Sequence, residues 1–284
     1  KLILRVLPQS ATGVFLFKKK SLDVFKIPFF LVDEFRKSHS LVVKKQGNSV
    51  QYIAINNTNP CFDKNFRKAL NFSINKKLII SKLLEGNAES VYGPLPKKYY
   101  PKVDKKETEE TYRYDKDKAV MHLKRSTCYP EIMKRKLDFR MRGDDENKSV
   151  GLSIQKYLNE IGLSVSISPM EKIQLYKENG EKKGDLTLLT WYLDSDSIVN
   201  LIDPIFSSVS QGNGGNRSFY SNKFIQNQID RIQKESALKK NKKYLKEIFE
   251  KIHEDAPWIF LWSVDENYIF SEKAKAFPRL QEFL

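Results

Sequence analysis

The sequence is poor in histidine and cysteine, the side chains on which most metal and nucleophilic sites depend. Cys61 and Cys128 lie far apart, with no CxxC or Cys/His ligand spacing, which argues against structural zinc and leaves a disulfide open. His39, His122 and His253 are isolated, and none lies near a serine or cysteine in a nucleophile-elbow sequence. We therefore expect no enzymatic activity, no metal site and no cofactor.

Long apolar runs and phosphate-binding loops are also missing. No stretch reaches the roughly 18 to 20 uninterrupted apolar residues that a membrane-spanning helix needs. The glycine-rich segment 212–216 lacks the Lys-Ser/Thr of a phosphate loop. Residues 1–7 alternate like a strand and do not resemble a signal peptide, so we expect a soluble chain that begins in mid-fold.

Acidic residues are fewer than basic ones, which gives a formal net charge of +15. Clustered lysines and arginines can neutralise nucleic-acid phosphates, but here the lysines are scattered in twos and threes. No recognisable nucleic-acid module accompanies them. We interpret the excess as a solvated, lysine-rich surface and expect no nucleic-acid partner; an anionic lipid surface or an acidic ligand stays open.

What the sequence does contain is an alternation of strand and helix patterns. With 284 residues, of which 40% are hydrophobic, the chain can form one large domain or two lobes. Strand patterns occupy 1–7, 22–24, 41–45 and 50–55, and helical patterns occupy 10–19 and 28–37. The first part of the chain is therefore predicted to be α/β.

The run from Tyr52 to Pro96 has a specific order of signals. A strand is followed by the bend 56–60, which is rich in Asn, Thr and Pro and which we interpret as a hinge crossing. Asp63 and Asn75 can each cap a helix, and Gly86 can end the second one. We expect the second helix to bury Leu78, Ile79, Leu83 and Leu84.

A βαβ unit follows, after a charged linker and a helix capped by Asp115. The strand 137–141, the helix 150–161 and the strand 163–167 predict two parallel strands joined by a right-handed crossover. A further strand, 185–191, leads into the block TWYLDSDS, residues 190–197. Ligands tend to bind at the carboxyl ends of strands in α/β sheets, so this block is the candidate site.

The run 52–96 and the TWYLDSDS block resemble the family 5 extracellular solute-binding proteins, which serve peptide- and nickel-type ABC importers. In that family a Pro-Phe-Asp-(variable)-Arg-(variable)-Ala-Leu helix follows the crossing strand, and a Trp-(variable)-(variable)-Asp block follows a later one. The segment NRSFYSN, the triplet Asp255-Ala256-Pro257 and the apolar strand 258–262 match the family's later part. The resemblance runs to about residue 277 and covers the C-terminal half of the family only.

The resemblance implies an α/β fold: a periplasmic-binding-protein-like lobe of type II, or cluster C, with a mixed sheet flanked by helices. Part of the other lobe accompanies it. We expect residues 1–56 to close lobe I, residues 57–263 to form lobe II, and residues 264–284 to return to lobe I. The rest of lobe I, with any signal peptide or lipid anchor, is expected to lie outside this sequence.

Asp194 occupies the position of the family aspartate that pairs with the free amino group of a bound peptide. A charge-assisted hydrogen bond of this kind is worth roughly 1.5 to 3 kcal/mol. The alternative is a helix N-cap or an exposed loop carboxylate. Ser195 stands where the family usually has tyrosine, and the expected Asp-Pro pair is displaced to Asp203-Pro204.

Further ligand contacts are expected from five residues. Trp191 and Trp262 are large enough to stack on ligand side chains, although tryptophan in a strand is more often part of the core. Tyr192, Ser195 and Arg140 complete the expected ligand-binding set.

The implied function is that of an ABC importer's substrate-binding component. It would bind oligopeptides between two hinged lobes and deliver them to membrane permease subunits, with residues 50–56 and 258–263 as hinge strands. Its location would be periplasmic or extracytoplasmic, with anchoring as a lipoprotein left open. The alternatives are the same fold carrying nickel, haem or another solute, and a structural or adhesive derivative without transport.

Overall fold

The structure is a computed structural model that describes residues 3–7, 10–38, 41–100, 112–193, 198–234 and 238–275. Contacts divide the chain into two compact units. The smaller comprises Lys1–Gly47, Ile80–Glu89 and Val264–Leu284, and the larger comprises Asn48–Ile79 and Ser90–Ser263. In the described ranges, no helix is long and apolar enough to cross a membrane.

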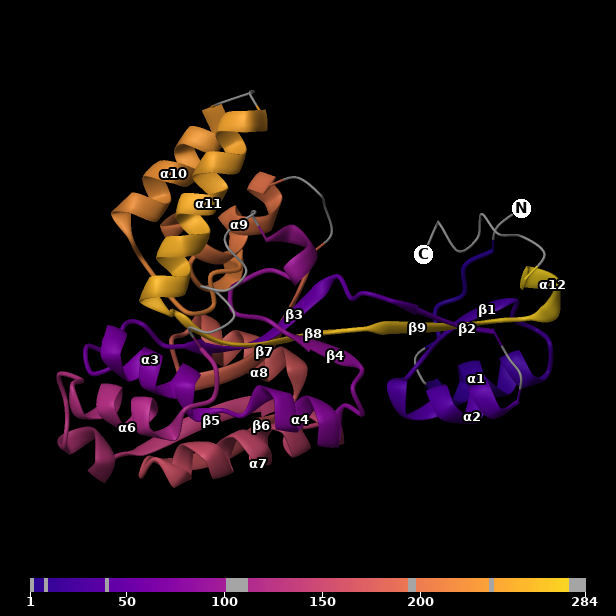
Figure 1. The fold of residues 1–284 in the computed structure, drawn as a ribbon, viewed down its shortest axis with the longest axis horizontal. Coiled ribbons are helices and arrows are strands. Elements are labelled where there is room, and N and C mark those ends of the chain that lie inside the picture. The colour runs from indigo at the N-terminus through magenta and orange to yellow at the C-terminus, as the bar shows by residue number, and fades with distance from the viewer. Residues whose placement is uncertain are drawn as a thin grey trace. The chain divides into compact units, whose positions relative to one another are not determined.

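The smaller unit is built on a three-stranded sheet in the order β1-β9-β2. Its strands are β1 (Val24–Ile27), β2 (Leu41–Lys45) and β9 (Glu266–Phe270), and both outer strands pair antiparallel with β9. The helices α1 (Ser10–Lys18) and α2 (Val32–Lys37) lie on one side of the sheet (Figure 1). A further short helix, α12 (Glu272–Lys275), follows β9, and Phe29–Leu31 form a 3-10 turn, η1.

An apolar core holds this unit together. The side chains buried in this core are Ile27, Val32, Phe35 and Ile269. Their packing removes apolar surface of β1, α2 and β9 from water. Burial of this kind contributes roughly 25 cal/mol per Å² of apolar surface.

The second sheet is mixed and has six strands in the order β4-β8-β3-β7-β5-β6, and all of its strands except the short β4 lie wholly or almost wholly in the larger unit. The strands are β3 (Ser49–Ile55), β4 (Ala88–Ser90), β5 (Lys136–Arg142), β6 (Ser164–Met170), β7 (Leu186–Tyr192) and β8 (Trp258–Val264). Strand β3 pairs antiparallel with both β7 and β8, whereas β5 pairs parallel with both β6 and β7. The predicted parallel pairing in the βαβ unit is confirmed.

Helices flank this sheet, as expected for the fold class (Figure 1). They are α3 (Lys64–Ser73), α4 (Lys76–Leu83), α6 (Lys116–Lys124), α7 (Asp145–Glu160), α8 (Lys172–Gly180), α9 (Ile198–Phe206), α10 (Lys223–Lys234) and α11 (Leu238–Asp255). The described residues also form the 3-10 turns η2 (Lys97–Tyr99), η3 (Glu131–Lys134), η4 (Ser208–Ser210) and η5 (Gly212–Gly214). Helix α3 packs against α6, and α10 packs against α9 and α11.

The predicted helix caps are confirmed. The backbone N–H groups of Phe66, Leu78 and Lys118 donate to the side chains of Asp63, Asn75 and Asp115, over 2.8, 3.0 and 2.9 Å. Gly86 has a φ of +74°, in the left-handed region that favours glycine, as expected for a helix stop. These signals were readable because each cap and its partner lie three residues apart.

Other expectations are corrected. Residues 3–7 form no strand, because alternation produces a strand only where a neighbour pairs with it, and no described strand does so. The strand expected at 22–24 begins at Val24, and α7 begins at Asp145, where Asp144 caps it, instead of at 150. Leu78 is exposed, whereas its neighbours Ile79 and Ile80 are buried.

Two differences concern the division of the chain. Strand β3, expected at the end of the first segment, is a fully buried inner strand of the larger unit. The units therefore separate at Gly47/Asn48, before the bend 56–60, at Ile79/Ile80, at Glu89/Ser90 and at Ser263/Val264. Strand β4 lies in the segment 87–100, which was expected to be irregular.

Candidate functional site

One edge of the larger sheet collects the ends of five strands. Because β5, β6, β7 and β8 run in one direction and β3 runs against them, four carboxyl ends meet the beginning of β3 there. In the register, Ser49 lies opposite Tyr192 and Val50 lies opposite Trp191. Asn48 and Ser263, the first and last residues of the larger unit, also lie at this edge. The predicted block around Trp191 is thus placed at the carboxyl edge.

Tyr192 and Trp191 stand at this edge with different exposures. Tyr192 is 64% exposed, and Trp191 is half-buried. As consecutive residues of a strand, they point to opposite faces of the sheet, so they cannot both stack on one small ligand group. Their roles as ligand contacts stay predictions, and the exposed phenol of Tyr192 is the more accessible of the two.

Asp194 and Ser195 lie outside the described residues. The residue before them, Leu193, is buried and is held to the beginning of β3. Its N–H donates to the carbonyl oxygen of Asn48 over 2.9 Å, and the side-chain amide of Asn48 donates to its carbonyl oxygen. Leu193, the fourth residue of the candidate block, is therefore held by two hydrogen bonds to one residue.

Trp262 lies in the core of the larger unit. It is fully buried, and its Nε1–H donates to Oε1 of Gln51 over 2.7 Å. Gln51 in turn donates to Asn147, whose amide group donates to the α7 cap Asp144. In this conformation the indole offers no surface to a ligand, and it ties β8 to β3 and to the start of α7.

Arg140 is also engaged within the protein. Its Nε donates to Asp138 and its Nη1 to Glu178, both over 2.6 Å, and its side chain is only 14% exposed. Arg140 lies opposite Thr187, which is the second residue of β7 and is away from the carboxyl edge. The pair with Glu178 therefore connects β5 to α8, and in this conformation the guanidinium of Arg140 is engaged by two carboxylates of the protein. Its role as a ligand contact stays a prediction.

A group of aromatic and guanidinium side chains around α8 could not be recognised in the sequence. The guanidinium carbon of Arg217 lies 4.8 Å from the ring centroid of Tyr176, and its Nη1 donates to the Tyr176 carbonyl oxygen. Burial raises the pKa of the Tyr176 phenol and nearby Tyr192 adds to this, while Arg217 and Arg142 act in the opposite direction. These residues come from α8, β5, β7 and a loop, so no local sequence pattern could have grouped them.

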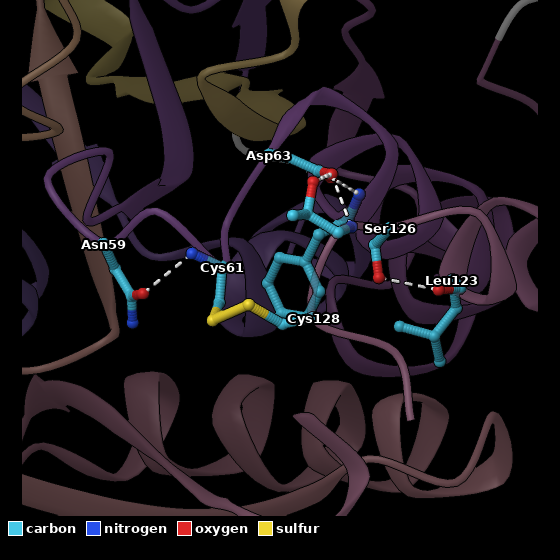
Figure 2. The surroundings of a disulfide bond; sticks show 8 residues. Asn59, Cys61, Asp63, Leu123, Ser126 and Cys128 are labelled. Atoms are coloured by element: carbon cyan, nitrogen blue, oxygen red, sulfur yellow. Dashed lines mark hydrogen bonds between the residues drawn. A yellow bond between two sulfur atoms is a disulfide. The ribbon is translucent and has the colours of Figure 1, made fainter. Parts of the chain in front are cut away.

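A disulfide links the loop before α3 to the loop after α6 (Figure 2). Cys61 and Cys128 are 67 residues apart in sequence, and their Cα atoms are 5.1 Å apart. Beside the disulfide, Asp63 accepts hydrogen bonds from the N–H and the hydroxyl of Thr127 in addition to its helix-capping bond. Burial alone would raise the pKa of Asp63, but these hydrogen bonds hold it below the ordinary value. The pairing left open in the sequence is thus present.

The described part of the chain contains no cluster of potential metal ligands. No group of three or more His, Cys, Asp or Glu side chains is close enough there to hold a metal ion.

Comparisons with known proteins are consistent across family, curated relatives and solved structures. Residues 1–213 match the family of bacterial extracellular solute-binding proteins, family 5, middle part. The chain is 23% identical to the probable D,D-dipeptide-binding periplasmic protein DdpA of Escherichia coli, covering 82% of this chain and 45% of that protein. It is 24% identical to the oligopeptide-binding protein AppA of Bacillus subtilis, covering 96% of this chain and 52% of that protein.

Among solved structures, the chain is similar to the periplasmic binding protein DppA of Helicobacter pylori, determined with the peptide STSA. The TM-score is 0.81 at 23% identity, and the match covers 94% of this chain and 52% of that one. The chain therefore spans about half the length of the relatives it matches. The family match extends over well more than half of the sequence. The chain belongs to family 5 of the bacterial extracellular solute-binding proteins.

Proposed function

We propose that this chain is part of the substrate-binding component of an ABC importer, which binds oligopeptides between two hinged lobes and delivers them to a membrane permease. The observation that carries the proposal is the edge where four strand ends meet, beside the exposed Tyr192. Ligands of α/β sheets bind outside the carboxyl ends of strands. Family membership supports solute binding, and the peptide ligands named for the relatives support the ligand class.

The proposed location is extracytoplasmic. The family is one of extracellular proteins, and the Cys61–Cys128 disulfide is a bond that forms and persists in oxidising compartments. Both observations support secretion of the protein that contains this chain.

Within the site, Asp194 is proposed to accept a hydrogen bond from the ligand's ammonium group. The proposal rests on its sequence position, directly after Leu193 at the carboxyl edge. A carboxylate and an ammonium removed from water form a charge-assisted hydrogen bond, whereas an acetylated amine offers no charge.

The experiment compares peptides with free and with acetylated amino termini. Asp194→Ala in the complete gene product should weaken binding of amino-free peptides by about ten- to a hundredfold, the equivalent of roughly 1.5 to 3 kcal/mol. Binding of acetylated peptides should change little. Isothermal titration calorimetry measures both affinities.

Asp33→Ala is the matched control, because it removes an exposed aspartate of the smaller unit. It should leave both affinities as in the parent. Equal loss for free and acetylated peptides in Asp194→Ala would contradict the assigned role.

A further inference from the structure

We propose that Arg217, stacked on Tyr176, binds a carboxylate group of the ligand. The proposal rests on the solute-binding function proposed above and deepens it, because it names a chemical group of the ligand and the residue that takes it. Both residues belong to the larger unit, where Tyr176 lies in α8 and Arg217 lies in the loop between η5 and α10. The net charge of +15 leaves an acidic ligand open but points to no residue that would bind it.

Arg217 differs in its partners from the arginines of β5. Arg140 and Arg142 are each paired with a carboxylate of the protein, whereas Arg217 forms an ion pair with none of the residues that the structure describes. Burial lowers the pKa of the Arg217 guanidinium, and the phenols of Tyr52 and Tyr176 act in the opposite direction. Phenols are uncharged at neutral pH. A half-buried cation is therefore left without a compensating charge from the described residues.

The protein holds the guanidinium by one nitrogen and one face. Nη1 donates to the Tyr176 carbonyl oxygen over 3.0 Å and to Oδ1 of Asn213 over 3.3 Å. The guanidinium carbon lies 4.8 Å from the centroid of the Tyr176 ring, which covers a face of the planar group. Nε and Nη2 donate to no described residue. These two nitrogens form an edge that can donate two parallel hydrogen bonds to a carboxylate, so a carboxylate-binding edge is left for a ligand.

Backbone contacts fix Arg217 before any ligand arrives. Its carbonyl oxygen accepts from Nδ2 of Asn179 over 3.1 Å, and its N–H donates to the Gly215 carbonyl oxygen over 2.8 Å. Asn179 is buried in α8, and its amide group also reaches Oγ1 of Thr187 in β7 over 3.4 Å. The loop that carries Arg217 is thereby tied to one helix and one strand. A guanidinium held in this way loses little conformational entropy when it binds a carboxylate.

Tyr176 connects the guanidinium to the carboxyl edge of the sheet. Its phenol is within electrostatic reach of Arg217 and also of Tyr192 and Arg142. Tyr192 and Arg142 are the last residues of β7 and β5, whose carboxyl ends form part of the candidate site. The Tyr176 side chain is half-buried, so one part of it packs in the protein and another part faces solvent. The proposed carboxylate site therefore lies next to the candidate site, beside α8.

Arg231 offers a matched control in the same unit. Its guanidinium carbon lies 6.0 Å from the ring centroid of Tyr244, and its Nη1 donates to Oε1 of Gln228 over 3.3 Å. It therefore combines an aromatic ring with an amide oxygen, as Arg217 does. Arg231 lies on α10 and is exposed, so water already solvates its charge. Arg231→Gln removes a guanidinium without touching the proposed site.

The first measurement does not depend on peptide binding. NMR spectra of the complete gene product, labelled with ¹⁵N-arginine, are recorded while sodium acetate replaces sodium chloride at constant ionic strength. The Nε–H signal of Arg217, assigned from its loss in Arg217→Lys, should shift and saturate in the millimolar range. The signals of Arg231 and Arg140 should move far less, because one is solvated and the other is already paired. An Arg217 shift no larger than that of Arg231 would overturn the site.

The second measurement uses four tetrapeptide libraries that differ in their carboxylates. The C-terminus is a free acid or an amide, and one internal position is glutamate or glutamine. Arg217→Gln should weaken binding of the libraries that carry the recognised carboxylate by about five- to twentyfold, and of the others by less than about twofold. A loss confined to the glutamate libraries assigns the site to an acidic side chain. A loss confined to the free-acid libraries assigns it to the C-terminus.

Two further variants separate recognition from stability. Arg217→Lys keeps the charge without the planar fork, so it should retain part of the preference for the carboxylate; it also decides the question if Arg217→Gln does not fold. Arg231→Gln should bind all four libraries as the parent does. Equal losses for all four libraries in the Arg217 variants would overturn the carboxylate site. If no library binds the parent, the peptide function fails, while the acetate titration still decides on the carboxylate site.

Discussion

Lys76 is a buried lysine at the start of α4 with few partners for its charge. Its Nζ donates to the Val91 carbonyl oxygen over 3.2 Å and lies 4.8 Å from the ring centroid of Tyr92. Burial lowers the pKa of Lys76 to about 7, and the nearby cation of Lys97 adds to the shift. His253, whose Nδ1 contacts the Tyr92 carbonyl oxygen, is kept neutral because burial lowers its pKa to about 4.

This shift makes stability depend on pH. Between about pH 7 and the ordinary lysine pKa of 10.5, the unfolded chain binds more protons at Lys76 than the folded chain does. The free energy of unfolding contributed by Lys76 therefore rises with pH in that window, by at most about 1.4 kcal/mol per pH unit. Urea denaturation of the parent and of Lys76→Met at pH 7, 8 and 9 should show the parent gaining stability relative to the variant.

Lys77 supplies the control for this prediction. It is the exposed neighbour of Lys76, and Lys77→Met should keep the pH dependence of the parent. Parallel pH profiles for the parent and Lys76→Met would contradict a buried, shifted ammonium.

Residue-level roles could be predicted from the sequence only where the partners are local. Asp63, Asn75 and Asp115 were identified as caps because the cap side chain and the backbone N–H group that donates to it lie within one helical turn. Trp262 and Arg140 were expected to contact a ligand, which stays a prediction, and in this structure their side chains bond within the protein. Gln51 is 211 residues from Trp262 and Glu178 is 38 residues from Arg140, so the local sequence indicates neither contact. Asp138, by contrast, is a partner of Arg140 only two residues away.

At the scale of elements, α3 and the loop after α6 are joined twice. The Cys61–Cys128 disulfide forms one link, and the bonds from Thr127 to Asp63 form the other (Figure 2). The disulfide closes a long loop, which restricts the unfolded chain more than a short loop does. The capping of α3 and the position of α6 are therefore coupled.

Removal of the disulfide should destabilise the larger unit. Cys61→Ser/Cys128→Ser should lower its free energy of unfolding by about 2 to 4 kcal/mol, because the unfolded chain regains the entropy of a 67-residue separation. Chemical denaturation with and without a reducing agent measures the effect. Reductant should destabilise the parent to the level of the variant and leave the variant unchanged; a parent insensitive to full reduction would contradict this prediction.

Helices and strands could be predicted where the hydrophobic periodicity is strong. The position of a strand was harder to predict where it depends on pairing with distant strands. The parallel strands β5 and β6 with the helix between them follow from alternation and helical spacing alone. The place of β3 between β7 and β8 depends on partners more than a hundred residues away, and no pattern in β3 specifies them. Residues 3–7 show the converse, since their alternation is clear and no described strand pairs with them.

At the scale of the whole molecule, family membership and the carboxyl edge lead to one testable function. The match to family 5 defines the type of fold and the class of protein, while the chain spans about half the length of its relatives. The ligand class is proposed from the Asp194 position and the edge at Tyr192. A carrier of nickel, haem or another solute would have the same fold and bind a different ligand.

The most direct measurement is mass spectrometry of the complete gene product, purified without added ligand. The protein is measured first in its native state and is then denatured, so that any bound ligand is released and its mass can be determined. We expect the released molecules to have the masses of short peptides. A tetrapeptide library with free amino termini should displace these peptides from the protein, whereas an acetylated library should not. Release of haem or of a nickel complex, or a protein that carries nothing and binds neither library, would contradict the proposed function.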